Sequence, residues 1–118
     1  MVKDINDPTQ LVFRALAHPA RRDVLVALLD RAGQSIAELM AGCDMTRQTF
    51  TQHLDALIDA DLVRFSYEGR ERLHYLNVLP LVHVTDEWMA RFVNPQVRAL
   101  LGLRQNVEAE SKAAKRRA

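Results

Sequence analysis

The amino-acid sequence predicts a mainly α-helical fold that contains one small β-hairpin. Apolar residues recur at helical spacing along most of the chain, whereas between residues 63 and 76 they alternate with polar residues, as they do in strands. Proline, glycine and capping residues divide the helical part into separate segments. The chain has 118 residues, so we expect one domain over residues 1–103 and a polar, basic tail over residues 104–118.

The first two helices are delimited by prolines. Asp7 followed by Pro8 predicts a helix start, because a carboxylate caps the N-terminus and proline is accepted at the first helical position. The residue before a proline is disfavoured in helical geometry, so we expect this helix to end just before His18 and the second to begin at Pro19. Gly33 is suited to end the second helix in a left-handed conformation. The side chains expected to face the core are Leu11, Val12, Ala15, Leu16, Val24, Leu25, Leu28 and Leu29.

Two more helices follow, separated by a tight turn. Ser35 and Glu38 have the spacing of a capping box, which predicts the start of a third helix. Residues 42–44 form the turn, and Thr46 caps a fourth helix over residues 46–60. The apolar side chains of the fourth helix that share one face are Phe50, Leu54, Leu57 and Ile58.

The other faces of the fourth helix carry side chains that can donate to and accept from base edges and phosphates. Such a helix, placed after a helix and a turn, is what major-groove recognition requires, whereas the same face taken alone would be an ordinary solvated surface. Asp55 and Asp59 repel phosphate, so the C-terminal half should point away from DNA. The candidate DNA-binding residues of this helix are Thr46, Arg47, Gln48, Thr49, Thr51, Gln52 and His53.

Residues 63–76 are predicted to form a hairpin that serves as a wing beside the fourth helix. The turn at residues 68–71 contains Gly69, which adopts positive φ readily. Arg70 and Arg72 lie near its tip and are candidate contacts to the DNA backbone or minor groove. The alternative is a merely charged turn, since two glutamates flank these arginines. Together these elements predict a winged helix-turn-helix.

The C-terminal part is predicted to be helical and interrupted once. Pro80 opens a long helix with Leu81, Val84, Trp88, Met89 and Phe92 on one side, and Asn94-Pro95 interrupts it before a further helical segment. We expect residues 111–118 to be frayed. The aromatic stripe is expected to be core or dimer interface, with the lining of a small-molecule pocket as the alternative.

Composition limits the class of protein. The net charge is +1, so DNA affinity has to come from local clusters of basic residues rather than from the total charge. A single cysteine, Cys43, excludes an intrachain disulfide, and we expect it to act as a small buried hydrophobe rather than a redox switch. No signal peptide or bilayer-spanning run is present, so a cytoplasmic location without membrane contact is expected. Motifs of phosphate loops, nucleophile elbows or zinc proteases are absent, so neither an enzyme nor a cofactor is expected.

Several segments resemble the ArsR-type (ArsR/SmtB-like) winged-helix repressors in order and spacing. They are FRALAHPARR at residues 13–22, the glutamate-leucine pair at 38–39, residues 49–54 with their QHL ending, residues 57–63, and the wing from EGR at 68–70 through HY at 74–75. The resemblance implies the element order ααααββα and a homodimeric transcriptional repressor of double-stranded DNA. It further implies that the fourth helix enters the major groove, and that the first and last helices pair the subunits. The dimer-interface residues expected on this basis are Leu11, Val12, Leu81, Val84, Trp88, Met89 and Phe92.

The chain departs from the metal-sensing members of that family. Their cysteine pair before the third helix corresponds to Ser35 and Ala37 here, and neither can supply a thiolate. Of the ligands that other members place on the last helix, only His83, Asp86 and Glu87 are available, and they are weak candidates. We therefore expect a member that does not sense metal.

Three functional hypotheses follow. The first is a repressor on a pseudo-palindromic operator with half-sites about 10 bp apart, released by an unidentified small-molecule inducer. The second is a metal- or redox-responsive sensor of the same fold. The third is a winged helix used only for protein contacts.

Two arginines of the second predicted helix have two possible roles. Arg21 and Arg22 either pair with acids of their own helix, such as Asp23 or Asp30, or touch phosphate.

Overall fold

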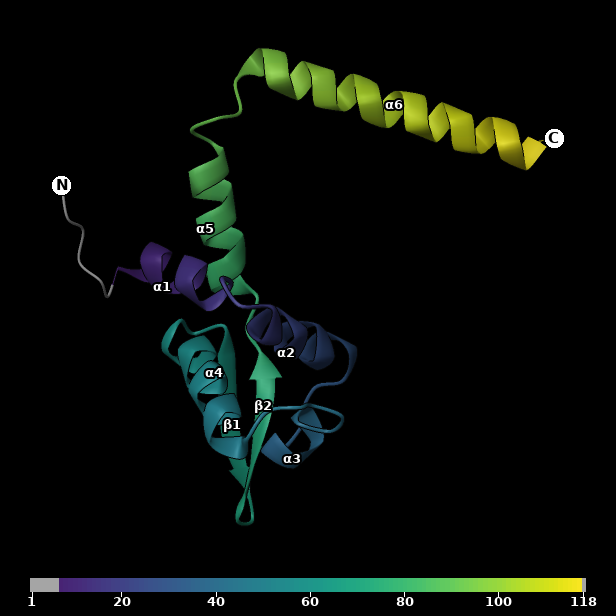
Figure 1. The fold of residues 1–118 in the computed structure, drawn as a ribbon. Helices are drawn as coiled ribbons and strands as arrows, with labels where there is room; N and C mark the ends of the chain where they lie inside the picture. The colour runs from purple at the N-terminus through teal and green to yellow at the C-terminus, as the bar shows by residue number, and fades with distance from the viewer. Residues whose placement is uncertain (1–6, 118) are drawn as a thin grey trace. The chain divides into compact units, whose positions relative to one another are not determined.

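A computed structural model describes residues 7–117 of the chain, of which Arg117 is described by its backbone alone. These residues form two compact units with the boundary between Val84 and Thr85. The helical fold with one antiparallel hairpin is confirmed (Figure 1). The elements are α1 (Pro8–Ala15), α2 (Pro19–Asp30), α3 (Ile36–Leu39), α4 (Arg47–Asp59), β1 (Val63–Glu68), β2 (Glu71–Leu76), α5 (Leu79–Met89) and α6 (Pro95–Arg117).

The starts of α1 and α2 are where the sequence places them. The Asp7 carboxylate accepts a hydrogen bond from the Thr9 backbone N–H at 2.9 Å, and Pro8 and Pro19 occupy the first turns of their helices. The predicted end of α2 is wrong, because the helix stops at Asp30. Gly33 does adopt positive φ, at +76°, but its N–H donates to the backbone carbonyl of His74 at 2.9 Å. This glycine therefore joins the loop after α2 to the hairpin.

Helix–turn–helix geometry follows from two N-terminal caps. The Ser35 hydroxyl accepts from the Glu38 N–H, and the Glu38 carboxylate accepts from the Ser35 N–H, each at 3.2 Å. The chain then turns at Gly42, whose φ is +77°. The Thr46 hydroxyl accepts from the Thr49 N–H at 3.2 Å and caps α4. Both predicted caps are confirmed.

One hydrophobic core holds the first unit together. α4 supplies three of its side chains, and α1, α2 and the start of β1 pack against them. The prediction that Leu29 faces this core is wrong, because 71% of it is exposed and α2 presents a narrower stripe. The buried apolar residues are Val12, Ala15, Val24, Leu25, Leu28, Phe50, Leu54, Leu57, Ala60, Leu62, Val63 and Val84.

One end of the hairpin packs against the core, and the end that carries the turn is exposed. Val63 pairs with Leu76 next to the core, whereas Tyr67 pairs with Arg72 near the Gly69–Arg70 turn. Burial falls along this side, from Val63, which is 1% exposed, to Tyr67, which is 67% exposed. The wing therefore projects from the core.

The second unit consists of the end of α5 and all of α6. α5 ends at Met89, so the prediction that Phe92 belongs to the same helix is wrong; its ring instead lies 4.7 Å, centroid to centroid, from that of Trp88. The Asn94 side chain accepts from the Val97 N–H at 2.8 Å, near the start of α6. α6 continues to Arg117, so the expectation of a frayed end is contradicted for the described residues. Among the helices that the structure describes, none combines the length and the apolar character that a bilayer-spanning segment requires.

Candidate nucleic-acid interface

The polar side of α4 stands opposite its buried stripe. Phe50, Leu54 and Leu57 are buried, and this fixes the rotation of the helix about its axis. Arg47, Gln48 and Gln52 are exposed, and their side chains make no hydrogen bond or ion pair with other residues that the structure describes. Their donors and acceptors are therefore available for a ligand.

The threonines of α4 are partly committed to the helix itself. The Thr46 hydroxyl caps the helix and also donates to the Thr49 hydroxyl at 3.0 Å. The Thr51 hydroxyl donates to the backbone carbonyl of Arg47 at 2.8 Å and is half-buried. Thr46 and Thr49 remain exposed, so a ligand can still reach their oxygens as acceptors.

His53 of α4 contacts α2 through a side-chain hydrogen bond. The Arg21 guanidinium donates through Nε to His53 Nδ1 at 3.2 Å, and the His18 ring centroid lies 5.1 Å from that of His53. Burial, followed by the charges of Arg21 and His18, lowers the pKa of His53 below its ordinary value. This half-buried imidazole is less available to a ligand than the glutamine beside it.

Arg21 and Arg22 do not pair with Asp23 or Asp30, which was one of the two alternatives that the sequence left open. Arg21 Nη1 donates to the Arg14 carbonyl at 2.8 Å, and Arg22 Nη1 donates to the Leu16 carbonyl at 2.6 Å. Both guanidiniums therefore satisfy carbonyls at the C-terminal end of α1, where the helix dipole favours positive charge.

The two wing arginines differ in their surroundings. Arg70 is exposed in the turn. Arg72 is half-buried, and its guanidinium carbon lies 3.8 Å from the centroid of the Phe65 ring, which is cation–π geometry. Arg72 Nε is buried and has no hydrogen-bond partner among the described residues.

These arginines and the first residue of α4 line one surface hollow of about 400 Å³, which we call the wing hollow. Arg47 comes from α4, whereas Arg70 and Arg72 come from the wing. The start of α3 completes the wall. The lining residues are Ser35, Ile36, Ala37, Arg47, Tyr67, Arg70, Glu71 and Arg72. Three of the predicted DNA-binding residues are therefore brought together.

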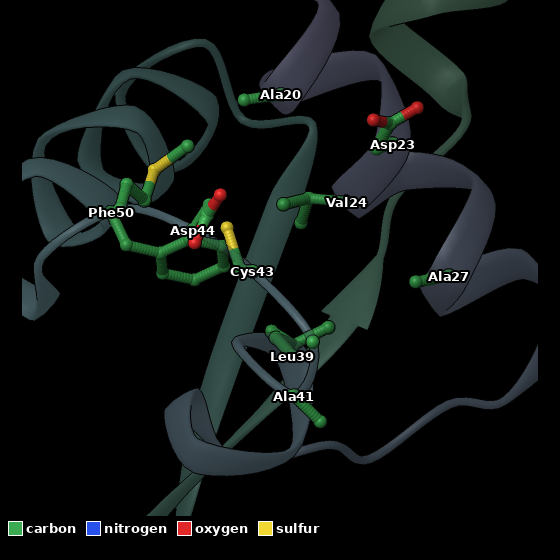
Figure 2. A pocket seen from close by; sticks show the side chains of 11 residues that line it. Ala20, Asp23, Val24, Ala27, Leu39, Ala41, Cys43, Asp44 and Phe50 are labelled. Carbon is green, nitrogen blue, oxygen red and sulfur yellow. The ribbon is translucent and has the colours of Figure 1, made fainter.

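A second hollow, of about 470 Å³, lies between α2, α3 and the turn that precedes α4 (Figure 2). Cys43 lines it and is exposed, so the expectation of a buried cysteine is wrong. The turn keeps this residue at the surface. The lining residues are Ala20, Asp23, Val24, Ala27, Leu39, Ala41, Gly42, Cys43, Asp44, Met45 and Phe50.

The candidate metal ligands are not assembled. Among the described residues, no three His, Cys, Asp or Glu side chains are placed to hold a metal ion. His83, Asp86 and Glu87 are exposed on α5. Ser35, one of the two positions that correspond to the cysteine pair of the metal-sensing members, is buried and its hydroxyl is engaged in the capping box.

The expected dimer-interface residues fall into three groups. Val12 and Val84 are buried in the core of a single chain, so their side chains have little surface to offer a partner. Leu11 and Leu81 are half-buried against that core. The exposed members are Trp88, Met89 and Phe92.

A buried polar pair, Gln34 and His74, was missed by sequence reasoning. Residues 34 and 74 form a β-bridge, and His74 is 0% exposed. Its Nδ1 lies 2.8 Å from the Gln34 carbonyl oxygen, which can only accept, so Nδ1 carries the proton. The Gln34 amide donates to the carbonyls of Ala27 and Arg31 at 2.9 and 2.7 Å.

Comparison with known proteins identifies relatives that also contain a helix-turn-helix. Residues 16–64 match the model of a helix-turn-helix domain family. The chain is 34% identical over 90 residues to the HTH-type transcriptional regulator CmtR of Mycobacterium tuberculosis. The matched residues cover 76% of this chain and 69% of the relative. It is 30% identical over 91 residues to the uncharacterized HTH-type transcriptional regulator YuzN of Bacillus subtilis, covering 72% of this chain and 99% of the relative.

Solved structures agree with these relatives. The crystal structure of an ArsR family transcriptional regulator is similar with a TM-score of 0.65 and 30% identity, over 77% of this chain and 91% of that one. An ArsR-like transcriptional regulator from Rhodococcus sp. RHA1 gives a TM-score of 0.67 and 28% identity, over 92% of this chain and 98% of that one. The chain therefore belongs to the ArsR family of winged helix-turn-helix, DNA-binding transcriptional regulators.

Proposed function

We propose that this regulator is a cytoplasmic homodimeric repressor that binds a pseudo-palindromic operator. The N-terminal half of α4 enters the major groove of each half-site, and the wing follows the adjacent backbone. The observation that carries this proposal is that Arg47, Gln48 and Gln52 are exposed on a helix whose rotation is fixed by a buried stripe. Repression follows because a dimer over a promoter excludes polymerase.

Charge along α4 supports this orientation. Arg47 stands at the N-terminal end, where the helix dipole also favours phosphate. Asp55 and Asp59 are exposed nearer the C-terminal end and repel phosphate. The N-terminal half is therefore the half that approaches DNA.

Dimer formation is supported by exposed apolar side chains in the second unit. A monomer in water gains nothing from exposing them, whereas a second copy can bury them. An isologous contact of this kind also sets two α4 helices in two-fold symmetry, which matches two half-sites about 10 bp apart. The exposed apolar residues are Trp88, Met89, Phe92, Leu100, Leu101, Leu103 and Val107.

We further propose that the signal is not a metal ion bound beside α3. Ser35 and Ala37 offer no thiolate, and Ser35 is engaged in its capping box. Addition of micromolar zinc is therefore expected to leave DNA affinity unchanged. Release of DNA by zinc, lost on His83→Ala, would instead support the sensor hypothesis.

A binding titration with mutants tests the DNA-binding surface. The full chain is titrated against its own upstream DNA by fluorescence anisotropy at two salt concentrations. Arg47→Ala should weaken binding and lower the slope of log K against log salt by about 1 if it contacts phosphate, or cost about 1–3 kcal/mol if it reads a base. Arg64→Ala is the matched control, because Arg64 is paired with Asp61 at 3.0 Å.

The same titrations with Arg47→Ala and Arg64→Ala also test the third hypothesis, a winged helix that is used only for protein contacts. If Arg47→Ala binds DNA as the wild type does, α4 is not the recognition helix and a protein-contact function gains support. If wild type does not bind any upstream DNA at low salt, where even nonspecific contacts are strong, the repressor proposal fails.

A further inference from the structure

The wing hollow has the volume of a small-molecule site and a lining that is more polar than apolar. Ligand pockets combine apolar walls with a few convergent polar groups and have volumes of about 300–1,000 Å³. This hollow, of about 400 Å³, has Ile36, Ala37 and the exposed Tyr67 ring beside Arg47, Arg70 and Arg72. It is larger than a phosphate group, so there is room for an organic group as well.

The charges around the hollow favour an anion. The lining contains three arginines and a single acidic residue, Glu71. None of the three arginines makes an ion pair with another described residue. Arg72 has its Nε buried without a partner and its guanidinium held against Phe65, so its orientation is already restricted. A planar guanidinium of this kind suits bidentate contact with phosphate oxygens.

We propose that the wing hollow binds a free organic phosphate, whose phosphate group contacts Arg47, Arg70 and Arg72 and whose organic part packs on Tyr67. Its regulatory consequence rests on the proposed function: the ligand occupies guanidiniums that DNA also needs, so it competes with the operator. Such competition requires no change of shape, because the two ligands share charged groups.

Isothermal titration calorimetry of the full chain without DNA tests this site with two probes, inorganic phosphate and phenyl phosphate. Phenyl phosphate should bind saturably and about tenfold or more tightly than inorganic phosphate, since only it contacts Tyr67. Arg72→Gln should weaken phenyl phosphate about tenfold or more. Arg70→Gln, in the exposed turn, should weaken it in the same direction and guards against misfolding of the first variant. Arg64→Gln is the control on the same hairpin and should change nothing.

A second arm separates the free ligand from a DNA phosphate. Adding operator DNA should displace phenyl phosphate. If neither probe binds saturably, while Arg72→Gln weakens DNA binding, the hollow holds only a backbone phosphate and the inference is overturned. It is also overturned if phenyl phosphate binds wild type, Arg70→Gln and Arg72→Gln alike. Since the probe titrations contain no DNA, they test the hollow even if the repressor proposal fails.

Discussion

The two units of this chain use their apolar residues in opposite ways. Every buried apolar residue in the described chain belongs to the first unit, up to Val84. In the second unit, large apolar side chains such as Phe92, Leu100 and Leu103 are exposed. The part that carries α4 and the wing has a buried core of its own, whereas the exposed apolar side chains of the C-terminal part are the ones that the proposed dimer would bury.

The largest expected effect on the free energy of unfolding comes from removing a buried side chain of α4. Leu54→Ala should lower the free energy of unfolding by about 2–5 kcal/mol, because a leucine that is 0% exposed leaves a cavity. Leu103→Ala, on the exposed part of α6, is the matched control and should change it by less than about 0.5 kcal/mol in the dissociated chain. Urea denaturation at low protein concentration measures both. Equal losses would refute the contrast.

A charge in the second unit should separate assembly from folding. Phe92→Glu should shift the chain from dimer to monomer in sedimentation velocity, because a buried interface cannot accept an unpaired carboxylate. The helical circular dichroism of the first unit should persist, and DNA affinity should fall by about tenfold or more because the two half-sites are no longer bound together. A Phe92→Glu chain that remains a dimer would place the interface elsewhere.

Loss of the α3 cap should have a smaller effect. Ser35→Ala removes the acceptor of the Glu38 N–H and should cost about 0.5–2 kcal/mol of the free energy of unfolding. The capping box also lowers the pKa of Glu38, chiefly through the hydrogen bond from the Ser35 N–H. Ser35→Thr retains a hydroxyl and should restore most of the stability, as thermal denaturation would show. If both variants match the wild type, the cap does not stabilise the fold.

Acid should weaken the link between the wing and α2. Burial lowers the pKa of His74 below its ordinary value of 6.5, so the folded chain binds fewer protons than the unfolded chain at acidic pH. The free energy of unfolding should therefore fall as the pH decreases below about 6.5. Protonation places a new N–H at Nε2, which is buried without an acceptor and lies near the positive charge of Arg72.

Urea denaturation at pH 7.5 and pH 5.5 measures this change. His74→Asn should be less stable but less sensitive to pH, since its amide can still donate to Gln34 yet does not titrate. His83→Gln, on the exposed side of α5, is the control and should keep the wild-type drop. A drop of the same size in His74→Asn would contradict the assignment.

Local chemistry made much of this fold predictable. The Asp7, Ser35 and Thr46 caps each depend on partners two or three residues away, so the sequence shows them directly. The stripe of α4 and the alternation of the hairpin are equally local patterns. Arg47 could be assigned to the exposed side of α4 for the same reason.

Features that depend on distant parts of the chain were not predictable. Gly33 and Gln34 take their positions from His74, 40 residues along the chain, and nothing near either end of that contact signals it. The exposure of Cys43 likewise depends on tertiary packing. The wing hollow combines three elements, so its existence followed only from the structure.

The most direct test of the account is a native mass measurement of the regulator with an operator duplex. It predicts two chains on each duplex for the wild type. Arg47→Ala should remain a two-chain dimer but lose most of the DNA complex. Phe92→Glu should be a single chain. A wild-type complex with one chain per duplex, or an Arg47→Ala dimer that keeps full DNA occupancy, would contradict the division between the DNA-reading first unit and the pairing second unit.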